Sequence, residues 1–191
     1  MALETAKGRI DAGSFVIAAG AWSEGLLGEL GLQVATRPIR GQIALLNPGR
    51  AILSRIIEWG KRYLVPRDDG RILVGSTEED VGFVRETTDE AIFGLCELAG
   101  RLIPALQAVP IERAWAGLRP GSLDSRPYLG FAPGFENVVV ATGHQRAGLQ
   151  LSAGTAVIAA SLLTGQPSPI DLKAFRVDRG PTSEESDAFR S

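Results

Sequence analysis

Cysteine and histidine are almost absent from this sequence of 191 residues. It contains one cysteine, Cys96, and one histidine, His144. A single cysteine excludes an internal disulfide framework and points to a reducing compartment. One cysteine and one histidine are also too few for a zinc cluster built from these residue types, so no metal site is expected.

The spacing of glycine excludes several nucleotide-binding motifs. None of the 23 glycines lies two positions from another, so the sequence contains no G-x-G. The dinucleotide-binding fingerprint and the glycine loop of protein kinases are therefore both absent. No serine has a glycine two residues away on each side, which excludes the nucleophile elbow. The motifs G-x-x-x-x-G-K and H-E-x-x-H are also missing, so an isolated hydrolase, kinase or metalloenzyme has no support.

Charge of either sign is neither in excess nor clustered. The 20 basic and 22 acidic residues give a net charge of −2, and no basic patch indicates a nucleic-acid partner. The first residues lack the apolar segment of a signal peptide. The most apolar helical stretch, 148–163, is too short to cross a bilayer. We therefore expect a cytoplasmic protein without a membrane span.

The composition is otherwise that of an ordinary globular protein. Hydrophobic residues make up 45% of the chain, and a chain of this length can bury a sizeable core. Near each end an unbroken apolar run is followed by glycine and then by a helical segment. The first pair is a strand at 15–19 and a helix from Ser23, as its N-cap, to Gly31. The second pair is a strand at 137–141 and a helix at 148–163.

Between these two pairs the pattern predicts antiparallel strands and one helix. The helix begins at Thr87 or Thr88 and ends before Pro104, with apolar residues along one face. The Pro/Gly-rich segment 119–133 has no predicted strand, and the residues after Asp178 are expected to be frayed. The expected strands are a short one at 9–12, one at 34–46 interrupted by Pro38 and Gly41, a hairpin of 52–58 and 61–66, and two more at 71–76 and 111–118. This order predicts a β-rich module inserted into an α/β frame.

Two segments carry unusual motifs. One is W-A-G-L-R-P-G at 115–121, followed by D-S-R-P-Y-L-G at 124–130, and the other is A-T-G-H-Q-R-A-G-L-Q-L at 141–151. In the second, an apolar strand leads into a glycine and then a helix, whose first amides suit an anionic or electron-rich ligand edge. Arg119 and Arg146 follow predicted strand ends, where ligands bind in open α/β sheets, and two converging guanidinium groups could hold a carboxylate.

These segments resemble the C-terminal half of the FAD-dependent glycine oxidase and D-amino-acid oxidase family, and are closest to the glycine oxidases of thiamine biosynthesis. The shared pattern is W-A-G-L-R-P-G, then D-x-x-P-Y-x-G, then G-H-x-R-x-G before an apolar helix. Further similarity lies in 18–23, in 38–42 and in one hairpin motif formed by 63–67 with 71–77, so that six ordered motifs cover roughly residues 9–178.

The resemblance implies a mixed α+β and α/β fold. Its antiparallel-rich substrate-domain sheet would carry a flanking helix. Beside it would lie the C-terminal strands and helix of an FAD-binding Rossmann-type domain whose N-terminal half is absent. Residues 1–36 and 132–178 would form the FAD-binding remnant, residues 37–131 the substrate-binding domain, and residues 179–191 a frayed tail.

The resemblance also implies roles for particular residues. Arg119 would bind the substrate carboxylate, Arg146 would be a second arginine near the substrate, and Tyr63 would line the pocket. The flavin would meet the loop and helix start formed by His144, Gln145, Arg146, Ala147, Gly148, Leu149 and Gln150, and the backbone at Gly20, Gly41 and Gln42. Gln145 and Ala147 replace an aromatic residue and an asparagine of the glycine oxidases, and Lys61 replaces a histidine, so the substrate stays open.

The implied activity is FAD-dependent oxidation of the C–N bond of a small amino acid or amine, by hydride transfer to the flavin. The implied partners are the missing Rossmann half, in the same chain or another, and a second copy of the chain bound through exposed edges. The alternative is a non-catalytic carboxylate-binding or interaction domain, or an inactive remnant, that does not bind FAD alone. The lack of G-x-G favours this alternative, and the intact loop at 143–150 opposes it.

Overall fold

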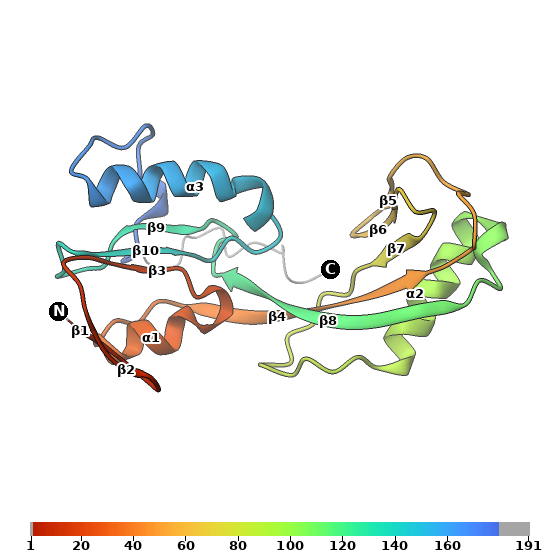
Figure 1. Cartoon of the computed structure of the whole chain (residues 1–191), viewed down its shortest axis with the longest axis horizontal. Helices are drawn as coiled ribbons and strands as arrows, with labels where there is room; N and C mark the ends of the chain where they lie inside the picture. Colours follow the sequence, from red (N-terminus) through yellow and green to blue (C-terminus); the bar gives the residue numbers. More distant parts are fainter. Residues whose placement is uncertain (1, 180–191) are drawn as a thin grey trace. The chain divides into compact units, whose positions relative to one another are not determined.

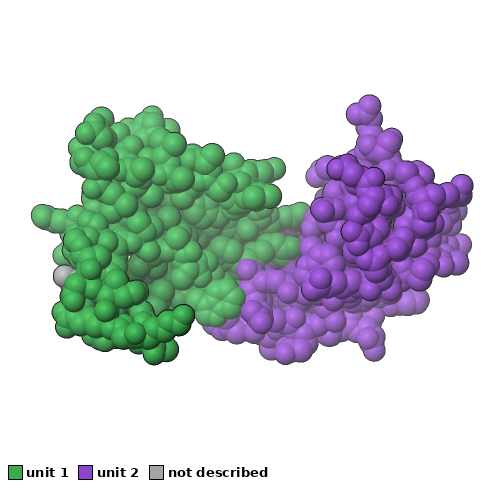
Figure 2. Space-filling model, in the orientation of Figure 1, with its two compact units in different colours: residues 1–38, 119–191 green, residues 39–118 purple. Residues whose placement is uncertain are grey.

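The computed structural model describes residues 2–179, which form two compact units (Figure 2). Unit 1 comprises residues 1–38 and 119–191, and unit 2 comprises residues 39–118. The chain passes between the units inside two long strands, β4 (Thr36–Leu46) and β8 (Ile111–Ser122). The predicted domains divide at 36/37 and 131/132, and their assignment to FAD and substrate binding stays a prediction.

Unit 1 contains a three-stranded sheet with a helix on each face (Figure 1). Val138 and Val140 of the central strand pack with Leu27 of helix α1 (Ser23–Glu29), whereas Ala141 packs with Ile158 of helix α3 (Gly148–Leu163). Because side chains alternate along a strand, the two helices cover opposite faces. The strands in sheet order are β3 (Phe15–Ile17), β10 (Val138–Thr142), which is parallel to β3, and β9 (Tyr128–Phe131), which is antiparallel to β10.

Unit 1 also contains a separate hairpin and two short turns of 3-10 helix. The hairpin pairs β1 (Ala2–Thr5) with β2 (Gly8–Asp11) in antiparallel register. The turns are η1 (Gly20–Trp22), which leads directly into α1, and η3 (Lys173–Phe175). The sequence pattern predicts a strand near the position of β2 but none at that of β1.

Unit 2 is a five-stranded sheet with helix α2 (Asp89–Leu102) packed on one face (Figure 1). The order is β5 (Ile57–Trp59), β6 (Arg62–Pro66), β7 (Ile72–Gly75), β4 and β8. Leu64 and Val74 are fully buried in a core with Leu95 of α2. The alternate residues Tyr63 and Gly75 therefore lie on the face away from the helix. The short turn η2 (Pro104–Leu106) follows α2.

The predicted mixed fold class is confirmed. An antiparallel-rich sheet carries one flanking helix, and a parallel strand pair with helices accompanies it. Helix α3 has the predicted bounds, and α2 begins after its predicted cap, since the Ala91 N–H donates to Thr88 Oγ1 (3.4 Å). The hairpin around Trp59 and Gly60 is also present.

The Pro/Gly-rich segment 119–133 contains strand residues, although the sequence pattern predicts no strand there. Strand β8 continues through Arg119 and Pro120 to Ser122, and β9 pairs with β10. Partner strands satisfy the backbone here, which local propensity does not reveal. Arg119 therefore lies inside a strand and not beyond its end.

Ser23 is not the N-cap of its helix, contrary to expectation. Trp22 occupies the cap position without a side-chain cap, because η1 leads straight into α1. The Ser23 hydroxyl donates instead to Thr142 Oγ1 (2.9 Å). The polar side chain thus links the helix to strand β10.

Pro38 and Gly41 do not interrupt β4, so the expected break is also absent. Arg40 and Glu79 exchange two backbone hydrogen bonds of 2.8 and 3.0 Å between these positions. From Ile43 the strand pairs with β7. Pairing on both sides of the glycine keeps the chain extended.

The predicted frayed tail, 179–191, lies outside the described residues except for its first member. Arg179 forms an ion pair with Asp124 (2.8 Å) and is not frayed. Of the helices in the described part of the chain, none is both long and apolar enough to cross a membrane.

Candidate functional site

Two parallel strands of unit 1 end at the same edge of their sheet. Strand β3 ends at Ile17, which is paired with Val140, and leads to Gly20; strand β10 ends at Thr142. The Thr142 hydroxyl donates to the Gly20 carbonyl (2.9 Å), so the two connections are joined. A helix follows each strand, and this edge of an α/β sheet is where ligands bind.

The loop after β10 is shaped by Gly143. Its φ is +77°, and a Cβ there would lie 2.9 Å from Tyr128 Cδ2 and 3.2 Å from Ser122 Cβ. Gln145 also has a positive φ, of +48°, and its N–H donates to the Pro120 carbonyl (2.9 Å). The loop consequently lies tightly against the end of β8.

This hydrogen bond joins the main chain beside the two arginines that the sequence singles out. Pro120 directly follows Arg119, and Gln145 directly precedes Arg146. Arg119 is half-buried and Arg146 is exposed. The fold thus joins the backbone of Pro120 to that of Gln145, 25 residues further along the sequence.

The side chain of His144 faces the following helix. Its Nε2 lies 2.9 Å from Thr155 Oγ1, and burial lowers the pKa of His144 below its usual 6.5. The imidazole is therefore neutral near pH 7. The Nε2 atom of the ring is therefore engaged with α3.

The start of α3 presents amide groups without intrahelical acceptors. The first bond within this helix end runs from the Leu151 N–H to the Ala147 carbonyl (2.9 Å). Ala147 is the N-cap and has no side-chain acceptor, and the first turn carries no acidic residue. The side chain of Leu149 is 90% exposed. Neither a capping side chain nor an acidic residue of the first turn therefore compensates the positive end of this helix dipole.

In unit 2, Tyr63 lies flat across the neighbouring strand. It is paired with Gly75, where a Cβ would lie 2.8 Å from two ring atoms of the tyrosine and from its hydroxyl oxygen. Glycine is therefore required at position 75 for the ring to take this place. Among the described residues, the Tyr63 hydroxyl has no hydrogen-bond partner. A half-buried ring with a free hydroxyl can orient a polar ligand.

Gln42 has its side chain committed inside unit 2. It is fully buried, its Nε2 donates to Glu79 Oε1 (2.9 Å) and its Oε1 accepts from the Thr88 N–H (2.7 Å). Its own N–H donates to Thr77 Oγ1 (2.9 Å). These contacts fix the start of α2, and the contact of the Gly41 and Gln42 backbone with the flavin stays a prediction.

A model of the FAD dependent oxidoreductase family, DAO, matches residues 2–162. The chain belongs to this family. The chain is 41% identical over 167 residues to the glycine oxidase of Pseudomonas aeruginosa, covering 87% of this chain and 46% of that protein. The glycine oxidase structure from Geobacillus kaustophilus has a TM-score of 0.88 at 30% identity, covering 94% of this chain and 49% of that one. The iminodiacetate oxidase from Chelativorans sp. BNC1 gives a TM-score of 0.85 at 27% identity, covering 93% and 49%.

These comparisons confirm the family resemblance drawn from the motifs. The chain spans about half the length of the relatives that it matches. The roles predicted for individual residues stay predictions, because they come from the motif resemblance alone. No motif pointed to the hydroxyls of Ser23 and Thr142 as partners, since they lie 119 residues apart and meet only in the fold.

FAD is the cofactor of this oxidoreductase family, and the residues of unit 1 fit its ring end. Gly143 lets the loop lie against Tyr128 and Ser122, and the amides at the start of α3 face no acceptor of their own helix. Such donors suit the electron-rich edge of a flavin. The sequence has no G-x-G to receive the pyrophosphate.

Proposed function

We propose that this chain forms the flavin-ring and substrate side of an FAD-dependent oxidoreductase acting on the C–N bond of a small amino acid or amine. The observation that carries this proposal is the shared edge of β3 and β10, where the loop at 143–147 is tied to β8 beside Arg119. Membership of the oxidoreductase family supports it.

The chain's own residues would bind and orient the reactants. The Arg119 guanidinium would hold the substrate carboxylate by paired hydrogen bonds, with Arg146 as a second cation near it. Tyr63 would line the substrate pocket through its ring and free hydroxyl. Residues 144–150, with the backbone at Gly20, would hold the flavin ring. The chemistry that FAD supplies when bound is acceptance of a hydride from the substrate carbon.

The partners of the chain are part of the proposal. A segment that carries G-x-G would hold the ADP end of FAD, and we expect the same or another polypeptide to supply it. A small carboxylate-bearing amino acid or amine is the proposed substrate. The cytoplasmic location stays a prediction, supported by the single cysteine.

A carboxylate-binding domain that does not hold FAD is the second candidate function. The observation that favours it is the absence of G-x-G from the whole sequence. It would use the same arginines and would show no flavin binding under any condition.

Titration of the purified 191-residue chain with FAD, followed by flavin absorbance, tests the proposal. We expect saturable binding with a perturbed spectrum. Leu149→Glu places a carboxylate at the helix start, where it would repel an electron-rich edge while favouring the helix itself. It should weaken FAD binding about tenfold, whereas the matched exposed variant Val157→Glu should not. The absence of a saturable change, or equal binding by both variants, would reject the flavin-ring role.

The substrate role is tested on the same FAD-loaded chain. Glycine or another small amino acid should perturb the flavin spectrum further, and Arg119→Gln should abolish this effect. Arg9→Gln removes an exposed arginine of unit 1 and is the matched control. An unchanged response in Arg119→Gln would rule out its role as the carboxylate anchor.

A further inference from the structure

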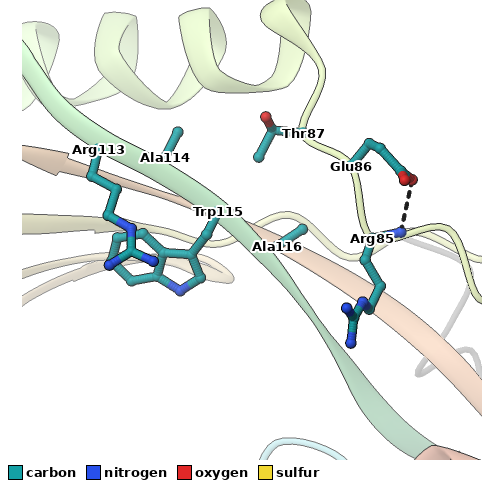
Figure 3. A pocket seen from close by; sticks show the side chains of 7 residues that line it. All are labelled: Arg85, Glu86, Thr87, Arg113, Ala114, Trp115 and Ala116. Atoms are coloured by element: carbon teal, nitrogen blue, oxygen red, sulfur yellow. Dashed lines mark hydrogen bonds between the residues drawn. The ribbon is translucent and has the colours of Figure 1, made fainter.

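A hollow of about 650 Å³ lies in unit 2 (Figure 3). Residues 85–87, which precede α2, line it together with residues 113–116 of β8. None of these residues has a role in the proposed function. The volume falls within the range of roughly 300–1,000 Å³ that is usual for small-molecule sites.

Arg113 and Trp115 form a stacked pair in this hollow. They are two positions apart on β8 and project from the same face, while Ala114 between them packs toward the core under α2. The guanidinium carbon of Arg113 lies 5.5 Å from the centre of the indole ring, and Figure 3 shows the group over the ring. Stacking fixes the guanidinium and leaves its N–H edges able to donate.

The charges around the hollow leave it positive. Among the described residues, neither Arg85 nor Arg113 has an ion pair. The Glu86 carboxylate accepts the backbone N–H of Arg85 (3.1 Å), and the Glu112 carboxylate accepts from the Arg71 guanidinium (2.7 Å). The lining therefore holds two guanidinium groups and one carboxylate.

We propose that this hollow binds a small organic anion with a planar ring, such as an aromatic carboxylate. Its carboxylate would accept hydrogen bonds from the Arg113 guanidinium, and its ring would lie against the exposed part of the Trp115 indole. Thr87 supplies a further hydroxyl in the lining. The site uses neither FAD nor Arg119, so it is independent of the proposed function.

Titration with 4-fluorobenzoate, followed by ¹⁹F NMR of the full chain without FAD, tests this site. We expect saturable binding that Arg113→Gln weakens about tenfold, the effect of losing one charge-assisted hydrogen bond. Arg101→Gln removes an exposed arginine at the end of α2 and should leave binding unchanged. Cyclohexanecarboxylate, which has the charge without the aromatic plane, should compete more weakly than benzoate.

A second readout locates the ligand. In ¹H–¹⁵N spectra the Trp115 indole N–H resonance should move on titration, and those of Trp22 and Trp59 should not. This shift should persist in Arg119→Gln and disappear in Arg113→Gln. The lack of saturable binding would overturn the proposal, and so would binding lost in Arg119→Gln but retained in Arg113→Gln. Because FAD is absent, failure of the FAD titration has no bearing on this result.

Discussion

At the scale of single residues, Gly143 fixes the loop on which the proposed flavin contact depends. Its φ is +77°, and only 2.9 Å would separate a Cβ at this position from the Tyr128 ring, so there is room for hydrogen only. Tyr128 is itself buried to 2% exposure, so its ring has little freedom to move. The path of the chain from β10 to α3 is therefore set by the absence of a side chain.

Gly143→Ala should destabilise the fold by about 2 kcal/mol or more, through left-handed backbone strain and overpacking against Tyr128. Urea unfolding followed by circular dichroism measures this loss. Gly154→Ala lies inside α3 with open space around it, and should instead stabilise by about 0.5–1 kcal/mol. Equal stability of the two variants would contradict the packing seen at Gly143.

His144 should titrate below pH 6.5, because burial disfavours its charged form. The folded state then binds this proton less tightly than the unfolded chain. Its contribution to stability is therefore complete above pH 6.5 and is lost as the pH falls through the folded-state pKa. The chain has one histidine, so one imidazole resonance in an NMR titration reports it. The urea-unfolded chain, as the control, should titrate near 6.5; a higher pKa in the folded chain would contradict the burial.

At the scale of elements, a buried polar network holds the start of α2 against β4. Gln42 bonds both Glu79 and Thr88, and the Arg40 guanidinium pairs with Glu79. Burial by itself would raise the pKa of Glu79, but hydrogen bonds from Thr77, Arg40 and Gln42 outweigh it and hold the pKa below its ordinary 4.5. The carboxylate is thus a structural group of unit 2.

Acidification should weaken the fold through Glu79. Since its folded-state pKa is depressed, its contribution to stability is complete above pH 4.5 and is lost as the pH falls through the folded-state value. Glu79→Gln should cost about 2 kcal/mol at pH 7 and flatten this acid dependence in urea unfolding. Glu90→Gln, on the exposed side of α2, should change neither the stability at pH 7 nor its acid dependence. If the stability of Glu79→Gln fell on acidification as steeply as that of the unmodified chain, the assignment to Glu79 would be refuted.

At the scale of the whole molecule, α3 leaves a large apolar surface. This helix of 16 residues has no charged side chain, and Ile158 is its only fully buried residue within the described chain. Its exposed large apolar residues are Leu149, Leu151, Val157 and Leu163. Exposed apolar patches of this kind mark interaction surfaces.

We expect the 191-residue chain to self-associate at micromolar concentration through α3. Val157→Lys should shift it toward monomer in light-scattering chromatography and change stability by less than about 0.5 kcal/mol. Phe93→Lys makes the same change on the exposed side of α2, where Phe93 is 70% exposed, and should leave association unaltered. A monomeric unmodified chain, or an equal effect of both variants, would refute this use of α3.

Much of the local structure could be predicted because it depends on near neighbours. The bounds of α3, the Thr88 cap and the hairpin at Trp59 and Gly60 each follow from spacing and turn residues. The strand across Arg119 could not be predicted, since its pairing partners are distant. The motif similarity identified Arg119 and Arg146, but only the fold ties their backbones together through Pro120 and Gln145.

The sequence by itself determined the family, the mixed fold class and the loop after β10, because ordered motifs and apolar periodicity depend on residues that are close together in sequence. The tertiary structure alone decided that Ser23 bonds Thr142 and does not cap its helix. It also decided that the Gln42 side chain accepts the Thr88 N–H and so holds the start of α2. In both cases a buried polar group must find a hydrogen-bond partner, and the partner that the fold brings close lies far away in sequence.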